Sequence, residues 1–507
     1  MSSLCELKSK QVKKDGIWSW VICICALLNN AIVQGIDASF GEIIGPLIRT
    51  LGSSASVVAW VPSIYTTNQS FFSWVSTIFT QKYGFRVVIS VGVLISFGAY
   101  LSAIWSENVI ALLLTYGVIG GAGSGLLYTP GNIISSYYFE KHIDIATSIA
   151  ICGGGIGIAF IEPLSNHINT KFGVNAVFAS FSCFSLLSLF LAIMAFPVMD
   201  KKDVSTCNAI DSQCTTPKKS KTAVISVNQA DSDKTEDVGS QTQKNVISKK
   251  DVRKFWNNAL DRYSTLKDMS GQDKTQMEEN QSQFHSLTCP SLTSLISNKD
   301  GKLSWIHVFD KFNLLKDLRL LFYCLTRIMF ELAYYIPIDF LPEMLVKDLG
   351  FPQSIKGTIL AVFGISSVVG RLASGMLAKL FPKHSIFISV LANVGMGSAC
   401  IGVTFCSKRE SFIGATVVYG LCTGCFYFYN VRILIDMYGV TDEFQDAYGF
   451  IMLASMFSNP WGPPIAGRLH DYFGLYNVAF YAAGIFSYIA ALFNIIMLLI
   501  QNTKYRD

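Results

Sequence analysis

Long apolar stretches recur through both ends of the chain, and they limit what the chain can fold into. Each stretch is close to the roughly 20 residues that an α-helix needs to cross the hydrocarbon core of a bilayer. The run from Val109 to Leu127 is continuously apolar in character rather than alternating. A membrane β-barrel would instead have alternating segments of about ten residues. Helical spans are favoured because each helix satisfies its own backbone hydrogen bonds.

The composition supports a membrane protein and argues against a nucleic-acid partner. Hydrophobic residues make up 51% of the 507 residues and charged residues only 15%, whereas roughly a quarter of the residues in a soluble domain are charged. The formal net charge of +5 is spread along the chain, so no concentrated basic surface is available for nucleic acid. We therefore expect the lipid bilayer to be the main environment of this chain.

The pattern predicts an all-α membrane protein of twelve transmembrane helices in two six-helix halves. The predicted spans lie near residues 17–40, 57–79, 86–106, 109–135, 145–167, 174–197, 318–341, 356–380, 385–406, 411–438, 446–466 and 475–500. Between the halves, a polar stretch with few aromatics is typical of a largely disordered loop. The predicted parts are an N-terminus (1–16), a first half (17–199), the loop (200–316), a second half (317–501) and a C-terminus (502–507).

Basic residues near the span ends predict the orientation of the helices in the membrane. Lys82, Lys141, Lys379 and Lys383 fall on the same side as the lysine-rich N-terminus. Both termini and the central loop are therefore expected in the cytoplasm.

Two pairs of short segments repeat across the halves with a common offset of about 300 residues. The segment 89–98 matches 388–397, and 171–178 echoes 472–480. A shared offset that falls at equivalent span boundaries favours an internal duplication. Two parallel six-helix halves joined by a cytoplasmic loop are similar to the arrangement of major facilitator transporters.

Two segments resemble the signatures of the monocarboxylate transporter family within that superfamily. Residues 14–20 are similar to the pattern D-G-[GS]-[WF]-[GA]-W, and residues 138–153 to Y-F-x-[KR]-[KR]-x-x-x-A-x-G-[LI]-A-x-x-G, with departures at Ile17, Ser19, His142 and Ser148. The matching residues that we expect to act in gating or as family motifs are Asp15, Gly16, Trp18, Trp20, Tyr138, Phe139, Lys141 and Gly153. Alternative roles for these residues are membrane anchoring by the tryptophans and close packing of helices at the glycines.

Ionisable residues inside the spans are the sharpest site candidates, because a charge at the bilayer centre costs at least about 2.5–3.5 kcal/mol. Arg371 corresponds to the substrate-binding arginine of the family that this chain resembles. A guanidinium can bind a carboxylate through two parallel hydrogen bonds. Its alternative role is packing near a cytoplasmic helix end.

The remaining candidates contribute charge, protons or aromatic surface. Arg327 and Glu331 are four residues apart and share a helical face, so they either pair structurally or take part in the site. Desolvated carboxylates are the obvious proton carriers in the spans. We expect substrate contacts from Arg371, Arg327, Phe426 and Phe428, and a proton or counter-charge role for Asp37, Glu162, Glu331 and Asp339.

The resemblance implies a plasma-membrane carrier that moves a monocarboxylate-like organic solute by alternating access. It implies a small organic solute as the partner, with or without a proton, and in some relatives a single-span ancillary membrane protein. Ala38 and Ser367 stand where proton-coupled lactate carriers of the family have a lysine and an aspartate. Proton coupling and the substrate are therefore left open, and a carrier of neutral or aromatic amino-acid-like solutes is an alternative.

Two further function classes were weighed. A non-transporting sensor or scaffold could use the long loop to recruit partners. An enzyme is not expected, because the spans contain no cluster of metal ligands and no nucleophile–base pair. No cofactor and no metal are expected either.

Overall fold

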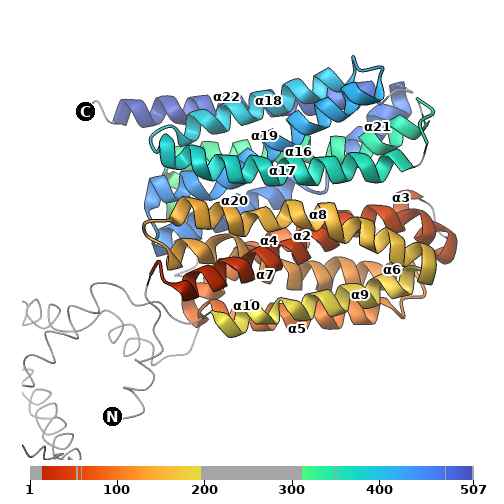
Figure 1. Ribbon diagram of the computed structural model, residues 1–507, viewed down its shortest axis with the longest axis horizontal. Coiled ribbons are helices and arrows are strands. Elements are labelled where there is room, and N and C mark those ends of the chain that lie inside the picture. The colour runs from red at the N-terminus through yellow and green to blue at the C-terminus, as the bar shows by residue number, and fades with distance from the viewer. Residues whose placement is uncertain are drawn as a thin grey trace, which may run out of the picture. The chain divides into compact units, whose positions relative to one another are not determined.

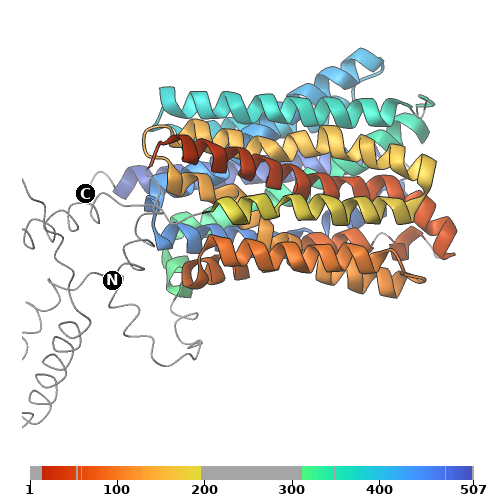
Figure 2. The same cartoon turned by 60° about the horizontal axis from the view of Figure 1, so that its bottom comes forward.

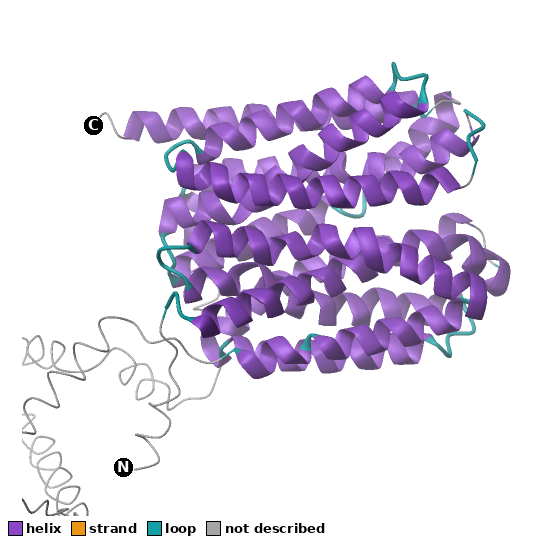
Figure 3. Cartoon of the chain, viewed as in Figure 1, coloured by secondary structure: helices purple, strands orange, loops and turns teal. Residues whose placement is uncertain are grey.

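The computed structural model describes residues 14–52, 55–58, 60–195, 311–347, 349–352, 354–473 and 476–504. Throughout these residues the regular secondary structure is helical (Figure 3). Most of the predicted central loop lies outside the described residues. Asp339 lies in a described helix, but its side chain is outside the described part of the structure.

The first half contains helices of very different length. They are α2 (Ile17–Leu51), α3 (Ala55–Val58), α4 (Trp60–Tyr83), α5 (Phe85–Ala103), α6 (Val109–Leu112), the π-helix η1 (Leu113–Gly120), α7 (Gly121–Tyr138), α8 (Ile143–Phe172), α9 (Val174–Leu187) and α10 (Leu189–Met194). Because α6, η1 and α7 follow one another without a break, and α9 and α10 nearly so, these segments make two crossings.

The second half repeats this plan. It contains the 3₁₀ helix η2 (Phe312–Lys316), then α16 (Leu318–Lys347), α17 (Ser354–Leu380), α18 (Ser385–Val403), α19 (Arg409–Tyr438), α20 (Asp442–Ser458), α21 (Gly462–Phe473) and α22 (Asn477–Lys504). With α20 and α21 counted as one interrupted crossing, the described helices form the twelve predicted spans. In Figures 1 and 2 the long helices lie side by side. The start of α2 and the end of α22 lie at the same end of the bundle. We call it the termini end.

Ten of the described helical segments are long and apolar enough to cross a membrane by length and composition alone. The two crossings that fall short have identifiable causes. The buried face of α4 is rich in serine, threonine and glutamine. The crossing formed by α20 and α21 is interrupted at Asn459–Trp461, where Pro460 cannot donate a backbone hydrogen bond to continue the helix.

The offset of 300 residues reappears in the helix boundaries. α5 and α18 are each 19 residues long and begin at Phe85 and Ser385. α7 and α19 end at Tyr138 and Tyr438. The equal spacing agrees with the duplication that the sequence predicts.

Glycines bring particular helices close together. A Cβ atom placed on Gly153 of α8 would lie 2.9 Å from the backbone nitrogen of Ala31 in α2. A Cβ atom on Gly121 of α7 would lie 2.6 Å from the carbonyl oxygen of Tyr65 in α4. Both distances are too short for a side chain, so these helices approach at the level of the backbone. The predicted packing role of the glycine-rich helices is visible here.

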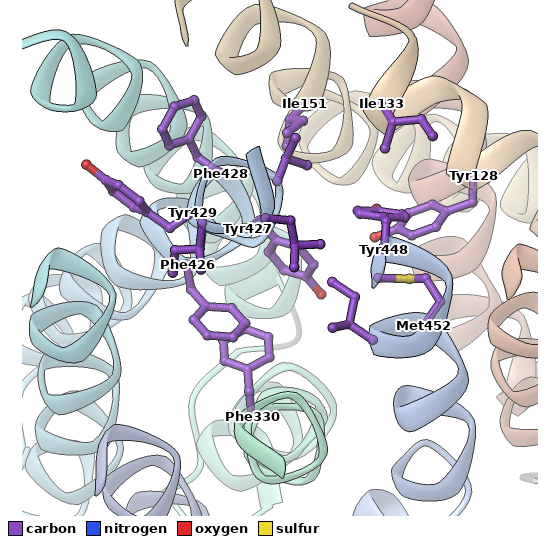
Figure 4. Close-up of a cluster of buried hydrophobic side chains, with 14 of the residues drawn as sticks. Tyr128, Ile133, Ile151, Phe330, Phe426, Tyr427, Phe428, Tyr429, Tyr448 and Met452 are labelled. Atoms are coloured by element: carbon purple, nitrogen blue, oxygen red, sulfur yellow. The ribbon is translucent and has the colours of Figure 1, made fainter. Parts of the chain in front are cut away.

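The largest group of buried apolar residues extends through both halves. It includes Ile133 of α7, Ile151 of α8, Phe330 of α16, Tyr427 of α19 and Met452 of α20 (Figure 4). The core therefore sits where the two halves meet, and this junction contains the buried charges considered next.

Candidate functional site

Aromatic and charged side chains converge where α16, α17 and α19 face α7, α8 and α20. In Figure 4, Tyr427 of α19 points toward the space beside Tyr128 and Tyr448, whereas Phe426 points toward Phe330. Phe428 points away from this space (Figure 4). Successive residues of a helix are about 100° apart, so α19 presents only one of its four consecutive aromatics to the junction directly.

Arg371 lies in α17 at the contact between the halves and is only 3% exposed. Its Nη1 donates a hydrogen bond to the carbonyl oxygen of Ile151 in α8 at 2.6 Å. The guanidinium carbon also lies 5.2 Å from the centre of the Tyr427 ring, within the range of a cation–π contact. Within the described part of the chain, Arg371 Nε has no hydrogen-bond partner, and no carboxylate forms an ion pair with Arg371.

Arg327 and Glu331 form an ion pair within α16, as their spacing predicted. Both are buried, with 3% exposure each. Arg327 Nε donates to Ser455 Oγ of α20 at 2.9 Å, and its guanidinium carbon lies 5.3 Å from the centre of the Tyr427 ring. Tyr427 therefore has both Arg327 and Arg371 as cation–π partners.

Tyr128 of α7 lies close to these charged side chains. It lies within electrostatic range of four charged side chains, two cationic and two anionic, which are Arg327, Glu331, Arg371 and Asp37. Asp37 is contributed by α2 and is partly buried. One helix of the first half, α2, and two of the second, α16 and α17, thus bring their charges to one region.

Other predicted residues lie outside this region or contribute packing. Phe426 is buried and stacks on Phe330, with ring centres 3.7 Å apart. Phe428 is buried against Tyr429, with ring centres 5.1 Å apart. Glu162 is buried in α8 and is followed by a proline. The roles expected for Phe426, Phe428 and Glu162 stay predictions.

Sequence reasoning missed Tyr128 and passed over Tyr427. Tyr427 was one of four adjacent aromatics, and only the rotation of α19 decides which of them faces the other half. A usable signal was its hydroxyl group, because a buried tyrosine needs a polar partner whereas phenylalanine does not. Tyr128 stands alone among glycines and leucines of α7, and the sequence contains no local sign that it faces the buried charges.

The two family signatures meet at the termini end of the bundle. The carboxylate of Asp15 accepts hydrogen bonds from the backbone N–H groups of Glu140, Lys141 and His142, at 3.2 to 3.4 Å. Partial burial acts to raise the pKa of Asp15, but these hydrogen bonds and the nearby His142 outweigh it and lower the pKa. Asp15 thus caps the turn that leads into α8, where the helix dipole favours an anion.

The remaining signature residues surround this cap. Trp20 packs edge-on against Phe139, with ring centres 4.9 Å apart, and Trp18 Nε1 donates to the carbonyl oxygen of Met194 at 3.1 Å. Gly16 precedes the first turn of α2. The carbonyl oxygen of Tyr138 accepts from the backbone nitrogen of Asp15 at 3.1 Å. These contacts hold the start of α2 against the turn between α7 and α8.

Several polar contacts join the halves at the termini end. Arg432 of α19 forms an ion pair with Asp144 of α8, and also pairs with Asp436 at 2.8 Å. The hydroxyl of Tyr137 donates to the carbonyl oxygen of Thr441 at 3.2 Å. The first-half and second-half helices are therefore fastened together at this end.

The last residues of the predicted loop also connect the two halves at the termini end. Lys311 Nζ donates to Asp446 of α20 at 2.7 Å and also to Gln81 of α4. Phe312 contacts Trp74 of α4 and Phe450 of α20, with ring centres 6.2 and 5.2 Å away. Residues 311–316, which the sequence assigned to the loop, are thus an ordered connector in contact with both halves.

An apolar cavity of about 20 Å³ lies elsewhere, inside the second half. It is lined by apolar residues of α16 to α19 such as Ile338, Phe363 and Val403, and by Thr416 and Tyr419. Without a charge in its lining, it has no means of orienting an anion. The charged junction around Tyr427 is therefore the better candidate site.

Comparisons with known proteins agree with this architecture. The family model described as the Major Facilitator Superfamily matches residues 22–241 and 323–506. Monocarboxylate transporter 10 of Rattus norvegicus is 22% identical over 97% of this chain and 80% of its own length. Monocarboxylate transporter 9 of Gallus gallus is 22% identical over 93% and 90%. Monocarboxylate transporter 14 of Mus musculus is 23% identical over 96% and 91%.

A solved structure gives the same answer at the level of the fold. The proton:xylose symporter XylE, bound to 6-bromo-6-deoxy-D-glucose, superposes with a TM-score of 0.61 at 11% identity, over 94% of this chain and 95% of the symporter. The predicted fold is confirmed. The chain is a membrane-transport protein of the Major Facilitator Superfamily, and its curated relatives are monocarboxylate transporters.

Proposed function

We propose that this protein carries a small organic anion of the monocarboxylate class across the membrane by alternating access, and that Arg371 binds the carboxylate of the solute. The observation behind this proposal is a buried guanidinium at the junction of the halves that has no ion-pair partner within the described residues. A buried cation without a counter-ion is costly unless something compensates it. A substrate carboxylate would form the direct ion pair that Arg371 lacks within the described residues.

The surroundings of Arg371 suit such a solute. Its Nε has no hydrogen-bond partner, so a donor remains for a carboxylate oxygen. Tyr427 offers an aromatic face and a hydroxyl group beside the guanidinium. Because Arg371 also donates to Ile151 across the junction, a bound anion competes with a contact between the halves. Substrate binding is thereby linked to the movement of one half against the other.

The membrane context is part of the same proposal. Lysines near the helix ends favour cytoplasmic termini. A plasma-membrane location and a single-span ancillary partner belong to the same proposal, because the resemblance of the two signatures to the monocarboxylate transporter family implies them. Epitope tags at the two termini of a cell-expressed protein should bind antibody only after permeabilisation. Antibody binding to intact cells would contradict this orientation.

Uptake into proteoliposomes tests the substrate assignment. Labelled pyruvate, lactate and phenylpyruvate are compared with labelled phenylalanine, a neutral amino acid, with and without a pH gradient. Uptake of the acids supports the proposal, whereas uptake of phenylalanine alone favours the neutral amino-acid-like alternative. No uptake of any solute favours a sensor or scaffold.

Substitution of Arg371 tests its role directly. Arg371→Lys retains the charge but not the planar fork, and should reduce uptake by about tenfold, which corresponds to ~1.4 kcal/mol. Arg371→Gln should nearly abolish uptake at normal surface expression. The matched control is Arg319→Gln, which removes an arginine that pairs with Asp317 at the termini end of α16. Normal transport by the Arg371→Gln protein would overturn the assignment.

A further inference from the structure

Within the described residues, the buried ion pair of Arg327 and Glu331 in α16 leaves one polar atom of each side chain without a hydrogen-bond partner. Glu331 binds Arg327 through Oε1, while its Oε2 has no hydrogen-bond partner. Arg327 Nη1 likewise has no hydrogen-bond partner. A buried polar atom left without a partner costs about 1–3 kcal/mol, and more when the group is charged. Glu331 Oε2 and Arg327 Nη1 are therefore each available to a further hydrogen-bond partner.

The four charged side chains around Tyr128 balance one another. Arg327 and Arg371 contribute two positive charges, and Glu331 and Asp37 contribute two negative charges. An anionic solute that bound alone would add an uncompensated negative charge to a buried region. Neutralising one carboxylate at the same time would restore the balance, because a proton and an anion together carry no net charge.

We propose that Glu331 is the proton acceptor that couples solute binding to proton uptake. This proposal rests on the proposed function. A proton from the aqueous phase adds to the Glu331 carboxylate, which becomes a neutral acid and loses its charge-assisted hold on Arg327. The Arg327 guanidinium stays cationic and is then free to bind the solute carboxylate together with Arg371. When the anion leaves, the proton leaves and the ion pair forms again.

The geometry supports this exchange between partners. Arg327 and Arg371 both contact the Tyr427 ring, at 5.3 and 5.2 Å from its centre, so one small anion beside this ring is within the reach of both. Arg327 keeps its Nε hydrogen bond to Ser455 Oγ at 2.9 Å, which is independent of Glu331. The guanidinium therefore remains in place when Glu331 is protonated, with its other nitrogens available.

The other groups that face Glu331 are poor candidates for the same role. They are Arg327, Tyr334 and Tyr335 of α16, Tyr427 of α19 and Tyr128 of α7. Arg371 of α17 and Asp37 of α2 reach the same tyrosines. Tyrosine stays neutral and arginine stays charged at physiological pH. Among these described groups, Asp37 is therefore the rival proton acceptor.

Glu331→Gln tests the proposal because glutamine imitates the protonated acid in shape. The experiment uses proteoliposomes and the acid from the panel above that wild-type protein takes up best. In the variant, exchange of labelled for unlabelled solute should persist, while the ratio of uptake with and without an inward proton gradient should fall to unity. Asp436→Asn is the matched control, since Asp436 also pairs with an arginine four residues earlier, and it should retain the stimulation by protons.

Three results would overturn the proposal. They are full proton stimulation in Glu331→Gln, loss of exchange in a normally expressed Glu331→Gln protein, and loss of proton stimulation in Asp37→Asn but not in Glu331→Gln. A failure of Arg371→Gln to reduce transport would instead contradict the proposed function.

A second measurement does not depend on the folding of a variant. A hydrophobic carbodiimide reacts with protonated carboxyl groups, and mass spectrometry of the wild-type protein locates the product. Labelling of Glu331 should increase as the pH falls and should increase further when the transported acid is present, because an anion bound to Arg327 and Arg371 favours the neutral acid form of Glu331. Labelling that does not change with pH would overturn the proposal.

Discussion

Arg371 can lie against α8 because residue 154 has no side chain. A Cβ atom on Gly154 would be 2.5 Å from Nη1 and 3.3 Å from the guanidinium carbon of Arg371. Both distances are shorter than ordinary van der Waals contacts, so a side chain at this position would have to displace the guanidinium. The contact between Arg371 and α8 therefore depends on the glycine at position 154.

Gly154→Ala should impair solute binding more than folding. The added methyl group pushes Arg371 away from the carbonyl oxygen of Ile151, and overpacking of this kind costs about 1–3 kcal/mol. We expect the KM for uptake to rise by about tenfold, equivalent to ~1.4 kcal/mol. Gly98→Ala is the control, because a Cβ atom there meets nothing within 4 Å. Equal KM values for both variants would show that Arg371 tolerates displacement.

Asp15 gives a prediction that depends on pH. Its backbone has a positive φ of 58°, a conformation that aspartate tolerates better than most residues. Because its pKa is lower in the folded protein than in the unfolded chain, its contribution to stability is complete above the unfolded value and is lost as the pH falls through the folded value. Asp15→Asn keeps a hydrogen-bond acceptor but loses the negative charge near the start of α8, and should lower stability near neutral pH by about 0.3–1 kcal/mol.

Thermal unfolding of purified protein in detergent measures this difference. At pH 7 the Asp15→Asn protein should unfold at a lower temperature than the wild type, and the gap should narrow at pH values below the folded pKa of Asp15. Lys141→Gln serves as the control, since Lys141 donates to Asp15 through its backbone nitrogen, which the substitution retains. An unchanged gap at all pH values would mean that the charge of Asp15 is irrelevant.

Charged residues stand out in the sequence of the spans more clearly than aromatic residues do. A charge inside an apolar run is rare and costly, so Arg371, Arg327 and Glu331 stood out by composition alone. Aromatic residues are common in the spans and most of them only pack, so the choice among Phe426, Tyr427 and Phe428 depended on the rotation of α19. Helical periodicity does not show which of these three residues faces the other half, because apolar and polar residues are distributed over all faces of α19.

At the scale of helices, apolar length predicted the crossings well and their ends less well. The predicted first span ended near residue 40, but α2 continues to Leu51, and its 35 residues correspond to about 52 Å. The predicted span at 446–466 is divided into α20 and α21. Hydrophobicity reports where lipid surrounds a helix, whereas the ends are set by turns, prolines and contacts with neighbouring helices.

The ion pair between α8 and α19 gives a prediction at this scale. Asp144→Asn removes one partner of Arg432 and should weaken the contact between the halves at the termini end. A cysteine at Thr441, which lies against Tyr137, should then react with a maleimide about fivefold faster, as expected for the loss of ~1 kcal/mol. Mass spectrometry of the modified peptide separates this site from the native cysteines.

Exchanging the two charges provides the control for that experiment. Asp144→Arg combined with Arg432→Asp restores an attractive pair, with Asp436→Asn added so that the new carboxylate does not face the one at position 436. This protein should return the reaction rate toward the wild-type value. If the single and exchanged variants react equally fast, the charges do not hold the halves together. Faster reaction in the exchanged protein than in either single variant would contradict the assignment of these two residues as partners.

At the scale of the molecule, the internal repeat allowed the fold to be predicted from the sequence. The equal offsets and the two signatures led to two six-helix halves, and the family model and the superposition on XylE agree. How the halves meet could not be read from the sequence, because contacts such as Arg371 with Ile151 join residues 220 positions apart.

Removal of residues 205–295 should leave folding and transport largely intact. This stretch is polar and cannot bury enough apolar surface to form a core, and the deletion stops before the connector that begins at Lys311. Surface expression and proteoliposome uptake measure the outcome. A control deletion that extends through Phe312 should reduce transport further. A protease-resistant fragment from residues 205–295 would contradict the expectation.

The connector at Lys311 and Phe312 has a kinetic consequence. Phe312 contacts Trp74 of α4 and Phe450 of α20, so the termini end cannot open without Phe312 leaving one of them. Each transport cycle that opens this end then includes the departure and return of the loop's last residues. The lifetime of that contact sets an upper limit on turnover. A protein that binds the loop next to residue 311 would slow transport without contacting the solute site.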